Sequence, residues 1–265
     1  MTRPVLSIIV PAYRKANSIA KDLASIAKVA SQIRYPAEII CVVDGFEDHT
    51  FAAASALTKT HPYLRVVGYK TNKGKGHAVR FGMAKSHGRI IAFIDAGMEI
   101  NPNSLSMILE HFEWYAADII VGSKRHPVSK VNWTFRRKLF SYVYQLINRL
   151  LFGLKIKDTQ AGLKVFRREV LEAVLPRLIV KRYAFDVEIL AVANHLGFNR
   201  MFEAPVEINF GVDSSTSAAT WQHIFYMLLD TAAIFYRLNI LHYYDDDSRR
   251  QWKFDPELNF RVNTA

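Results

Sequence analysis

The sequence predicts an α/β protein with a mainly parallel, doubly wound sheet and helices on both faces. Apolar runs of about five residues, typical of strands buried on both faces, alternate with segments of helical periodicity through the first half of the chain. Half of the 265 residues are hydrophobic and the composition is even along the chain, which favours one large core.

The expected strands are short, and several end in an acid or a glycine. Pro205 lies within the last of them and indicates an edge strand or a bulge. A further short strand is expected just before Arg167. The other strands cover Val5 to Val10, Glu38 to Val43, Leu64 to Val67, Ile90 to Ile94, Asp118 to Gly122 and Arg200 to Phe210.

The expected helices show apolar residues at helical spacing and start signals such as Asn17-Ser18 and Asn101-Pro102. A helix that begins near Ala184 carries two acids in its first turn. The other helices cover Ile19 to Ala30, Asp48 to Thr58, Ala78 to Lys85, Asn103 to Tyr115, Arg136 to Phe152, Arg168 to Val174 and Trp221 to Leu241.

The chain is expected to form one domain over residues 1–211, a loop and a helix over residues 212–244, and a polar tail over residues 245–265. The last helix is amphipathic, and Asp230 and Arg237 interrupt its apolar residues, so it is not expected to span a bilayer. Burial against the first domain and a position in the membrane interface both remain open for it. No apolar run is long enough for a signal peptide or a membrane span.

Charge and cysteine content narrow the class of partner. Cys41 is the only cysteine, which excludes a disulfide framework and a zinc cluster and fits a reducing compartment. The net charge is +11, and no acidic residue occurs between Ile119 and Lys157, a stretch rich in lysine and arginine. Nucleic acid, an anionic membrane surface and a phosphorylated substrate are the candidate partners, with a solvated basic face as the alternative.

Two acids follow buried strands of the predicted sheet. Because parallel strands place their carboxyl ends at one edge, Asp44 and Asp95 are expected to lie along the same edge, where α/β proteins bind ligands. Asp95 and Glu99 suit a divalent cation, although they could equally cap the next helix. The loop Lys70 to His77 is either a phosphate cradle at a helix start or a solvated turn. It lacks the spacing of a Walker A loop, and the absence of a GxGxxG motif disfavours an NAD site.

Several short motifs occur together in the order found in one family, over about residues 5 to 210. On these motifs the chain resembles family 2 glycosyltransferases of the GT-A fold, and most closely the polyprenyl-phosphate branch typified by dolichyl-phosphate mannosyltransferase. The motifs are Val10-Pro11-Ala12-Tyr13, Val43-Asp44-Gly45 with Asp48 and Thr50, Asn72-Lys73-Gly74-Lys75-Gly76 with Ala78, Asp95-Ala96-Gly97, Gly122-Ser123-Lys124-Arg125, Arg137-Lys138-Leu139 with Ser141, Asp158 with Gly162 and Phe166, and Phe185-Asp186-Val187-Glu188.

The resemblance implies a nucleotide-sugar site at the strand ends. Pro11, Tyr13 and Asp44 would hold the base and ribose of a UDP- or GDP-linked sugar, and Lys75 would hold the nucleotide side of the cleft. Asp95 and the adjacent Ala96 would contact the donor. Asp95 would also bind a Mg²⁺ or Mn²⁺ ion that bridges the diphosphate and acts as a Lewis acid.

The resemblance also implies an acceptor site in the basic stretch. Arg125, Arg137 and Ser141 match the positions that hold the acceptor phosphate, and Asp186 would orient the sugar or an arginine. A lipid monophosphate is already an oxyanion, so it needs positioning more than a general base. An acceptor hydroxyl would need such a base, and Asp186 and Glu188 are the candidates.

Two departures from the family pattern affect the chemistry. Arg14-Lys15 stands where the family usually has Asn-Glu, and Gly97 stands at the second acid of the metal motif. The cation would then depend on Asp95, Glu99, the diphosphate and water, which predicts weaker or different metal dependence.

The expected function is transfer of a sugar, with inversion, from a nucleotide donor to a membrane polyprenyl phosphate such as dolichyl or undecaprenyl phosphate. The protein is expected at the cytoplasmic face of the membrane as a peripheral protein, and a separate membrane protein as partner remains open. The alternatives are a glycosyltransferase acting on a hydroxyl and a non-catalytic nucleotide-sugar-binding subunit. A nucleic-acid partner is not expected, because no recognised nucleic-acid motif is present.

Overall fold

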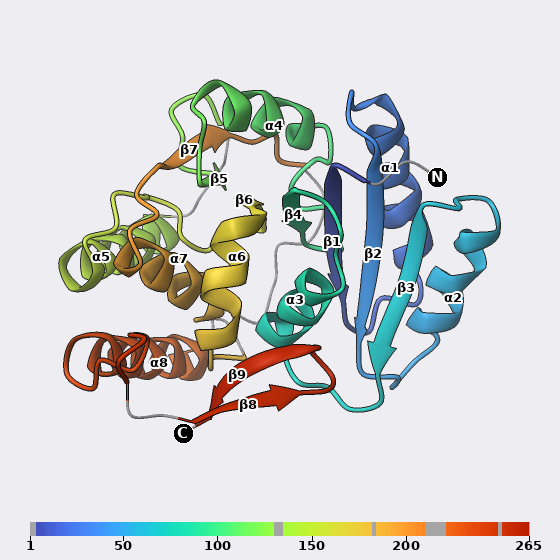
Figure 1. Ribbon diagram of the computed structural model, residues 1–265. Helices are drawn as coiled ribbons and strands as arrows, with labels where there is room; N and C mark the ends of the chain where they lie inside the picture. The colour runs from blue at the N-terminus through green and yellow to red at the C-terminus, as the bar shows by residue number, and fades with distance from the viewer. Residues whose placement is uncertain (1–3, 130–134, 182–183, 210–220, 249–250, 265) are drawn as a thin grey trace.

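A seven-stranded sheet in the order β3-β2-β1-β4-β6-β5-β7 runs through the centre of the molecule (Figure 1). The computed structural model describes residues 4–129, 135–181, 184–209, 221–248 and 251–264, without the side chains of residues 135–138, 221–223 and 263–264. The strands of the large sheet are β1 (Leu6–Ala12), β2 (Ala37–Asp44), β3 (Leu64–Tyr69), β4 (Ile90–Ile94), β5 (Ile119–Ser123), β6 (Leu163–Arg167) and β7 (Met201–Pro205).

The strand directions confirm the predicted mainly parallel sheet. β1 is parallel to β2 and β4, β2 is parallel to β3, and β5 is parallel to β7. β6 is the exception, because it runs antiparallel to both of its neighbours, β4 and β5. β7 forms an edge of the sheet, as the proline at its end predicted, since an edge strand tolerates a residue without an N–H donor.

Helices cover both faces of the sheet, as expected for a doubly wound fold. α1, α2 and α4 contribute to the core on one face, and α3 and α5 to α8 contribute to the core on the other face (Figure 1). The helices are α1 (Ile19–Gln32), α2 (Thr50–Ala56), α3 (Lys75–Ala84), α4 (Ser104–Trp114), α5 (Phe135–Phe152), α6 (Arg168–Val174), α7 (Phe185–His195) and α8 (Trp221–Asn239).

β1 illustrates why an uninterrupted apolar run suits this architecture. Ile8 and Val10 point into the core beneath α1 and α4, whereas the intervening Ile9 points into the core beneath α3 and α7. All three side chains are fully buried. A strand with one polar face would leave one of the two helical layers without an apolar partner.

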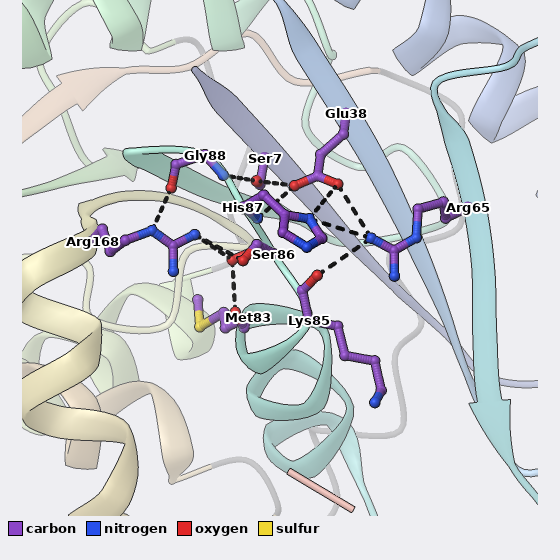
Figure 2. A network of polar contacts seen from close by, with 9 residues as sticks. All are labelled: Ser7, Glu38, Arg65, Met83, Lys85, Ser86, His87, Gly88 and Arg168. Atoms are coloured by element: carbon purple, nitrogen blue, oxygen red, sulfur yellow. Dashed lines mark hydrogen bonds and ion pairs between the residues drawn. The ribbon is translucent and has the colours of Figure 1, made fainter. Parts of the chain in front are cut away.

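A polar network links the amino-terminal ends of the parallel strands β1, β2 and β4 (Figure 2). The Glu38 carboxylate accepts hydrogen bonds from the Ser7 hydroxyl at 2.7 Å and from the His87 backbone N–H at 2.6 Å. The Ser7 hydroxyl in turn accepts from the Gly88 N–H at 2.8 Å, and the Arg168 guanidinium donates to the Gly88 carbonyl at 2.7 Å. These contacts join β1, β2, the start of β4 and α6 at the edge opposite the carboxyl ends of the parallel strands.

The part of the expected polar tail that the structure describes after residue 250 is folded. It forms a β-hairpin of β8 (Gln251–Asp255) and β9 (Phe260–Thr264), which lies beside α3 in Figure 1. Leu258, at its turn, is buried in the core, and the Trp252 ring lies 5.5 Å from the Arg177 guanidinium. These apolar and aromatic side chains explain why the segment packs rather than extends into solvent.

The predicted carboxy-terminal helix is present as α8, whereas the loop expected over residues 212–219 lies outside the described residues. The division of the chain at residues 211 and 244 stays a prediction. Within the described chain, no helix combines the length and the apolar character needed to cross a membrane. α3 begins at Lys75 rather than at Ala78, so a lysine of the predicted loop lies in the first turn of a helix.

Candidate active site

The carboxyl ends of β2, β1 and β4 lie side by side, as predicted from the parallel strands. Asp44 ends β2, Pro11 lies near the end of β1, and Asp95 directly follows β4. The loop over residues 70–74 and the start of α3 connect the two acids across the end of β1, because this segment contacts both of them. The two predicted acids therefore belong to one site.

Asp44 organises the loop before α3. Its buried carboxylate accepts hydrogen bonds from the backbone N–H groups of Lys73 and Gly74, at 2.7 and 3.0 Å, and from the Asn72 side-chain amide at 3.0 Å. Gly74 has a φ of 95°, a left-handed conformation that glycine adopts without strain and that turns the chain into the helix. A contact between Asp44 and a nucleotide base stays a prediction.

Lys75 pairs with Asp95 at the end of β4. The Lys75 ammonium lies 2.9 Å from Asp95 Oδ2. Gly162 permits this position, because a Cβ on that residue would lie only 2.5 Å from the same oxygen. The second oxygen, Asp95 Oδ1, is buried and has no hydrogen-bond partner within the described chain. A buried carboxylate oxygen without a partner needs an explanation, and a bound cation would supply one.

Beneath this pair lies a buried ionic network that extends from Asp95 to β6 and α7. Asp186 accepts from the Lys164 ammonium at 2.6 Å and lies 3.5 Å from the Lys75 ammonium. Burial alone would raise the pKa of Asp186, but the two ammonium groups outweigh it and lower that pKa. Burial lowers the pKa of Lys164, and Asp186 opposes that shift only in part. Asp186 is therefore held as a carboxylate within a salt bridge.

The pKa of Lys75 is shifted in the opposite direction from the pKa of Lys164. Burial would lower the pKa of Lys75, but the Asp186 and Asp95 carboxylates outweigh it and hold the pKa above its ordinary value. Lys75 is thus charged throughout the physiological range. A permanently charged ammonium at the start of a helix, where the helix dipole favours negative charge, suits a phosphate ligand.

The two predicted metal ligands, Asp95 and Glu99, each pair with a lysine. Glu99 Oε2 lies 2.7 Å from the Lys124 ammonium, Gly97 supplies no side chain, and cation binding by Glu99 stays a prediction. No cluster of three or more histidine, cysteine, aspartate or glutamate side chains suited to a metal occurs in the described ranges. Among the buried carboxylate oxygens of the described residues, only Asp95 Oδ1 lacks a hydrogen-bond partner. This fits a cation held mainly by a donor diphosphate and water, because Mg²⁺ uses as few as one carboxylate beside substrate phosphates.

The structure brings together two of the three residues predicted to hold the acceptor phosphate. The Arg125 guanidinium donates to the Ser141 carbonyl at 3.1 Å and to the Ser141 hydroxyl at 3.4 Å, and it also reaches the Lys157 carbonyl at 3.3 Å. The Arg137 side chain lies outside the described residues, although its backbone belongs to α5. Arg125 and Ser141 thus form a polar site at the first turns of α5.

Tyr13 lies at the exposed rim of the same edge. Its hydroxyl donates to Glu47 at 3.0 Å, and the same glutamate pairs with Arg14 at 2.6 Å. Ala96 is half-buried in the turn after Asp95. The roles of Tyr13 and Ala96 in donor binding stay predictions.

Lys164 belongs to this site but was not predicted from the sequence. Lys164 gave a usable signal, because a lone lysine inside an apolar strand needs a buried partner. Glu188, a candidate general base, accepts from the backbone N–H groups of Ile179 and Val180 and from the Tyr244 hydroxyl. Glu188 is fully buried, and it connects α7 to the carboxy-terminal segment rather than to the site.

Comparison with known proteins identifies the family. The model for glycosyl transferase family 2 matches residues 7–175, which is most of the chain and includes both strand-end acids. The chain belongs to glycosyl transferase family 2. This family 2 chain is 32% identical over 204 residues to a dolichyl-phosphate beta-glucosyltransferase from Dictyostelium discoideum, with 72% of this chain and 62% of that protein covered. It thus spans less than two thirds of the length of that relative.

Two further similarities extend the comparison. The family 2 chain is 28% identical over 204 residues to an undecaprenyl-phosphate mannosyltransferase from Micrococcus luteus, with 75% of this chain and 81% of that protein covered. The structure of a mannosyltransferase from Pyrobaculum calidifontis in complex with GDP-Man and Mn²⁺ is similar, with a TM-score of 0.59 and 18% sequence identity. The match covers 88% of this chain and 65% of the Pyrobaculum chain. The fold is the Rossmann-like GT-A fold, as predicted from the resemblance.

Proposed function

We propose that this family 2 glycosyltransferase moves a hexose from a nucleotide sugar to a polyprenyl phosphate in a membrane. The observation that carries the proposal is the continuity of a polar site with an exposed apolar surface. Arg125 and Ser141 lie at the first turns of α5, and the same helix exposes apolar side chains along its length. These exposed residues are Leu139, Phe140, Tyr142, Val143, Leu146 and Leu150.

α8 adds a second exposed apolar surface next to α5. The Tyr144 and Thr231 hydroxyls form a hydrogen bond of 3.0 Å that joins the two helices, which lie near each other in Figure 1. The large apolar side chains that α8 exposes are Phe225, Tyr226, Leu228, Leu229 and Tyr236. Contiguous apolar surface of this kind is costly in water and favours contact with a lipid layer. We propose peripheral binding at the cytoplasmic membrane face, with α8 in the interface.

The phosphate of such a lipid would meet Arg125 while its chain lay along α5. A guanidinium recognises phosphate through several parallel hydrogen bonds, which gives both charge and orientation.

In the proposed transfer, an acceptor phosphate oxygen attacks the anomeric carbon of the sugar from the face opposite the diphosphate. The new carbon–oxygen bond forms while the bond to the nucleoside diphosphate breaks, and the diphosphate leaves with that electron pair. The product is inverted at the anomeric carbon. No proton transfer is needed, because a phosphate monoester is already ionised.

On the donor side, Lys75 and the start of α3 would bind the diphosphate and stabilise its growing negative charge. Asp95 would hold a Mg²⁺ or Mn²⁺ ion, which when bound supplies Lewis-acid stabilisation of the same group. The GDP-Man and Mn²⁺ seen with the Pyrobaculum mannosyltransferase support this assignment. Tyr13, Pro11, Asp44 and Ala96 would line the nucleotide side.

A hydroxyl acceptor is less well supported. It would require a base, but Asp186 is engaged by Lys164 and its pKa is lowered, so it is poorly suited to accept a proton. The test is incubation of the protein with dolichyl or undecaprenyl phosphate and radiolabelled UDP-glucose or GDP-mannose. We expect labelled lipid in the organic phase. Label that never leaves the aqueous phase, with donor nucleotide bound but not turned over, would favour a non-catalytic subunit.

A further inference from the structure

A lysine lies where the metal motif lacks its second acid. A Cβ built on Gly97 would lie 3.1 Å from Lys15 Nζ and 3.7 Å from Lys15 Cε. Gly97 belongs to the turn that follows Asp95, two positions further along the chain. The two departures from the family pattern, a lysine for an acid and a glycine for an acid, are therefore in contact.

The backbone of Lys15 is fixed in this place. Its N–H donates to the Thr50 hydroxyl at 2.7 Å, and its carbonyl accepts from the N–H groups of Ser18 and Ile19 at 3.0 and 2.8 Å. The residue thus precedes α1 in a turn held from both sides. Because the backbone is already fixed, placing the Lys15 ammonium at the Gly97 turn requires ordering of the side chain alone.

The Gly97 turn is fixed as well. The Gly97 N–H donates to Asp22 Oδ2 at 2.9 Å, and Asp22 is buried on α1. The φ of Gly97 is 99°, where a side chain would be strained. The backbone conformation of the turn therefore disfavours any residue with a side chain, and so a second carboxylate, at this position.

Of Lys15, Lys75 and Lys124, Lys15 is the one without a carboxylate partner in the described residues. Lys75 pairs with Asp95, and Lys124 pairs with Glu99, at 2.9 and 2.7 Å. Lys15 forms no ion pair with a carboxylate in the described ranges of the chain. An ammonium next to two matched pairs carries a positive charge that an anionic ligand would neutralise.

We propose that Lys15 is a diphosphate-binding residue of the donor site and that its ammonium supplies, beside Gly97, part of the positive charge that a more firmly held metal ion would otherwise provide. The inference rests on the proposed function, because it requires a nucleoside diphosphate at Asp95 and Lys75. Its consequence is that nucleotide binding persists after metal removal and depends on Lys15.

The test is calorimetric titration of UDP and of GDP into the protein, in excess EDTA and separately in Mg²⁺ or Mn²⁺. For the base that binds, we expect Lys15→Ala to weaken binding in EDTA by about tenfold, the effect of one charge-assisted contact, and Lys15→Arg to retain most of the affinity. Lys28→Ala, a change at an exposed lysine of α1, should leave the affinity unchanged. Equal melting temperatures would establish that the variants are folded.

A second variant tests the exchange of lysine for metal directly. Lys15→Glu places an acid beside Gly97, so its nucleotide affinity should fall below that of Lys15→Ala in EDTA and recover more strongly when Mn²⁺ is added. Metal-dependent binding that Lys15→Ala leaves unchanged would overturn this inference while leaving the proposed function intact. Binding of neither nucleotide under any condition would remove the donor site and overturn both.

Discussion

Lys73, in the loop before α3, forms an ion pair with Glu257 of the carboxy-terminal hairpin. Its ammonium lies 2.5 Å from Glu257 Oε2, while its backbone N–H donates to Asp44 at 2.7 Å. Glu257 also lies 3.7 Å from His77, but burial and the Lys73 charge lower the pKa of His77 to about 4, so that histidine is neutral at physiological pH. The ionic link between the hairpin and the loop is therefore the Lys73 pair.

Removing this link should weaken donor binding. Because both side chains are about one third exposed, the pair contributes little in energy, and we expect Glu257→Gln to raise the KM for the nucleotide sugar by about threefold with little change in kcat. The difference from wild type should shrink at high salt. Glu172→Gln, which removes an exposed pair with Arg168, is the matched control. An effect on kcat alone would contradict a role in donor binding.

The buried salt bridge between Lys164 and Asp186 gives a prediction about stability. Asp186→Asn leaves the Lys164 ammonium buried without its charged partner at 2.6 Å, which should lower the free energy of unfolding by about 3 kcal/mol. The double variant Lys164→Met with Asp186→Asn removes both charges and should recover part of that loss. Denaturant unfolding of the single and double variants measures this coupling. Additive losses would mean that the two residues act independently.

Glu38 predicts a pH dependence of stability at the opposite edge of the sheet. Burial opposes ionisation of Glu38, but hydrogen bonds from Ser7 and His87 outweigh it and lower the pKa. The folded state thus has the lower pKa, so the stabilisation is fully present above the unfolded pKa and is lost as pH falls through the folded one. We expect Glu38→Gln to cost about 1 kcal/mol at pH 7 and less near pH 3, because the folded carboxylate is increasingly protonated as pH falls.

The measurement is guanidinium unfolding of wild type and Glu38→Gln at both pH values. Other carboxylates also titrate over this range, so the informative quantity is the difference between the two proteins. A difference that stayed constant with pH would show that the shape of the Glu38 side chain matters and that its ionisation does not.

Most helices and strands could be predicted from the sequence, because the spacing of apolar residues and the residues at strand ends are local properties. The common edge of Asp44 and Asp95 followed from parallel strands alone. The reversed direction of β6 did not follow, since strand direction depends on where the chain returns rather than on its period. The hairpin over residues 251–264 was missed because its strands are short and rich in charged residues, although Trp252 and Phe260 signalled some packing.

The site was predicted less completely than the fold. Glu99 was expected to bind a cation, but its pairing with Lys124 depends on two elements whose contact no sequence spacing reveals. The proximity of Lys15 and Gly97 could not be predicted either, because the sequence shows each residue only as a separate departure from the family pattern. Site geometry of this sort depends on tertiary packing, which motifs do not encode.

Arg125 should distinguish a phosphate acceptor from a neutral one. If the guanidinium binds the lipid phosphate, Arg125→Gln should lower kcat/KM for polyprenyl phosphate by about a hundredfold while the donor KM stays within about twofold. Arg34→Gln, at an exposed arginine paired with Glu110, is the control. An equal loss towards donor and acceptor would indicate instead that Arg125 supports the fold through Ser141 and Lys157.

The apolar surface of α5 should bind membranes. Leu146 and Leu150 are 47% and 74% exposed, so replacing both by aspartate removes apolar surface and adds charge without disturbing the core. We expect co-sedimentation with vesicles containing anionic lipid to fall by at least about tenfold, at an unchanged melting temperature. The matched control is Val128→Asp, which adds a charge at an exposed apolar residue on a turn outside both helices. If the α5 variant kept its vesicle binding while Leu229→Asp on α8 abolished it, the interface would lie on α8 alone, and the lipid chain would have to approach Arg125 by another route.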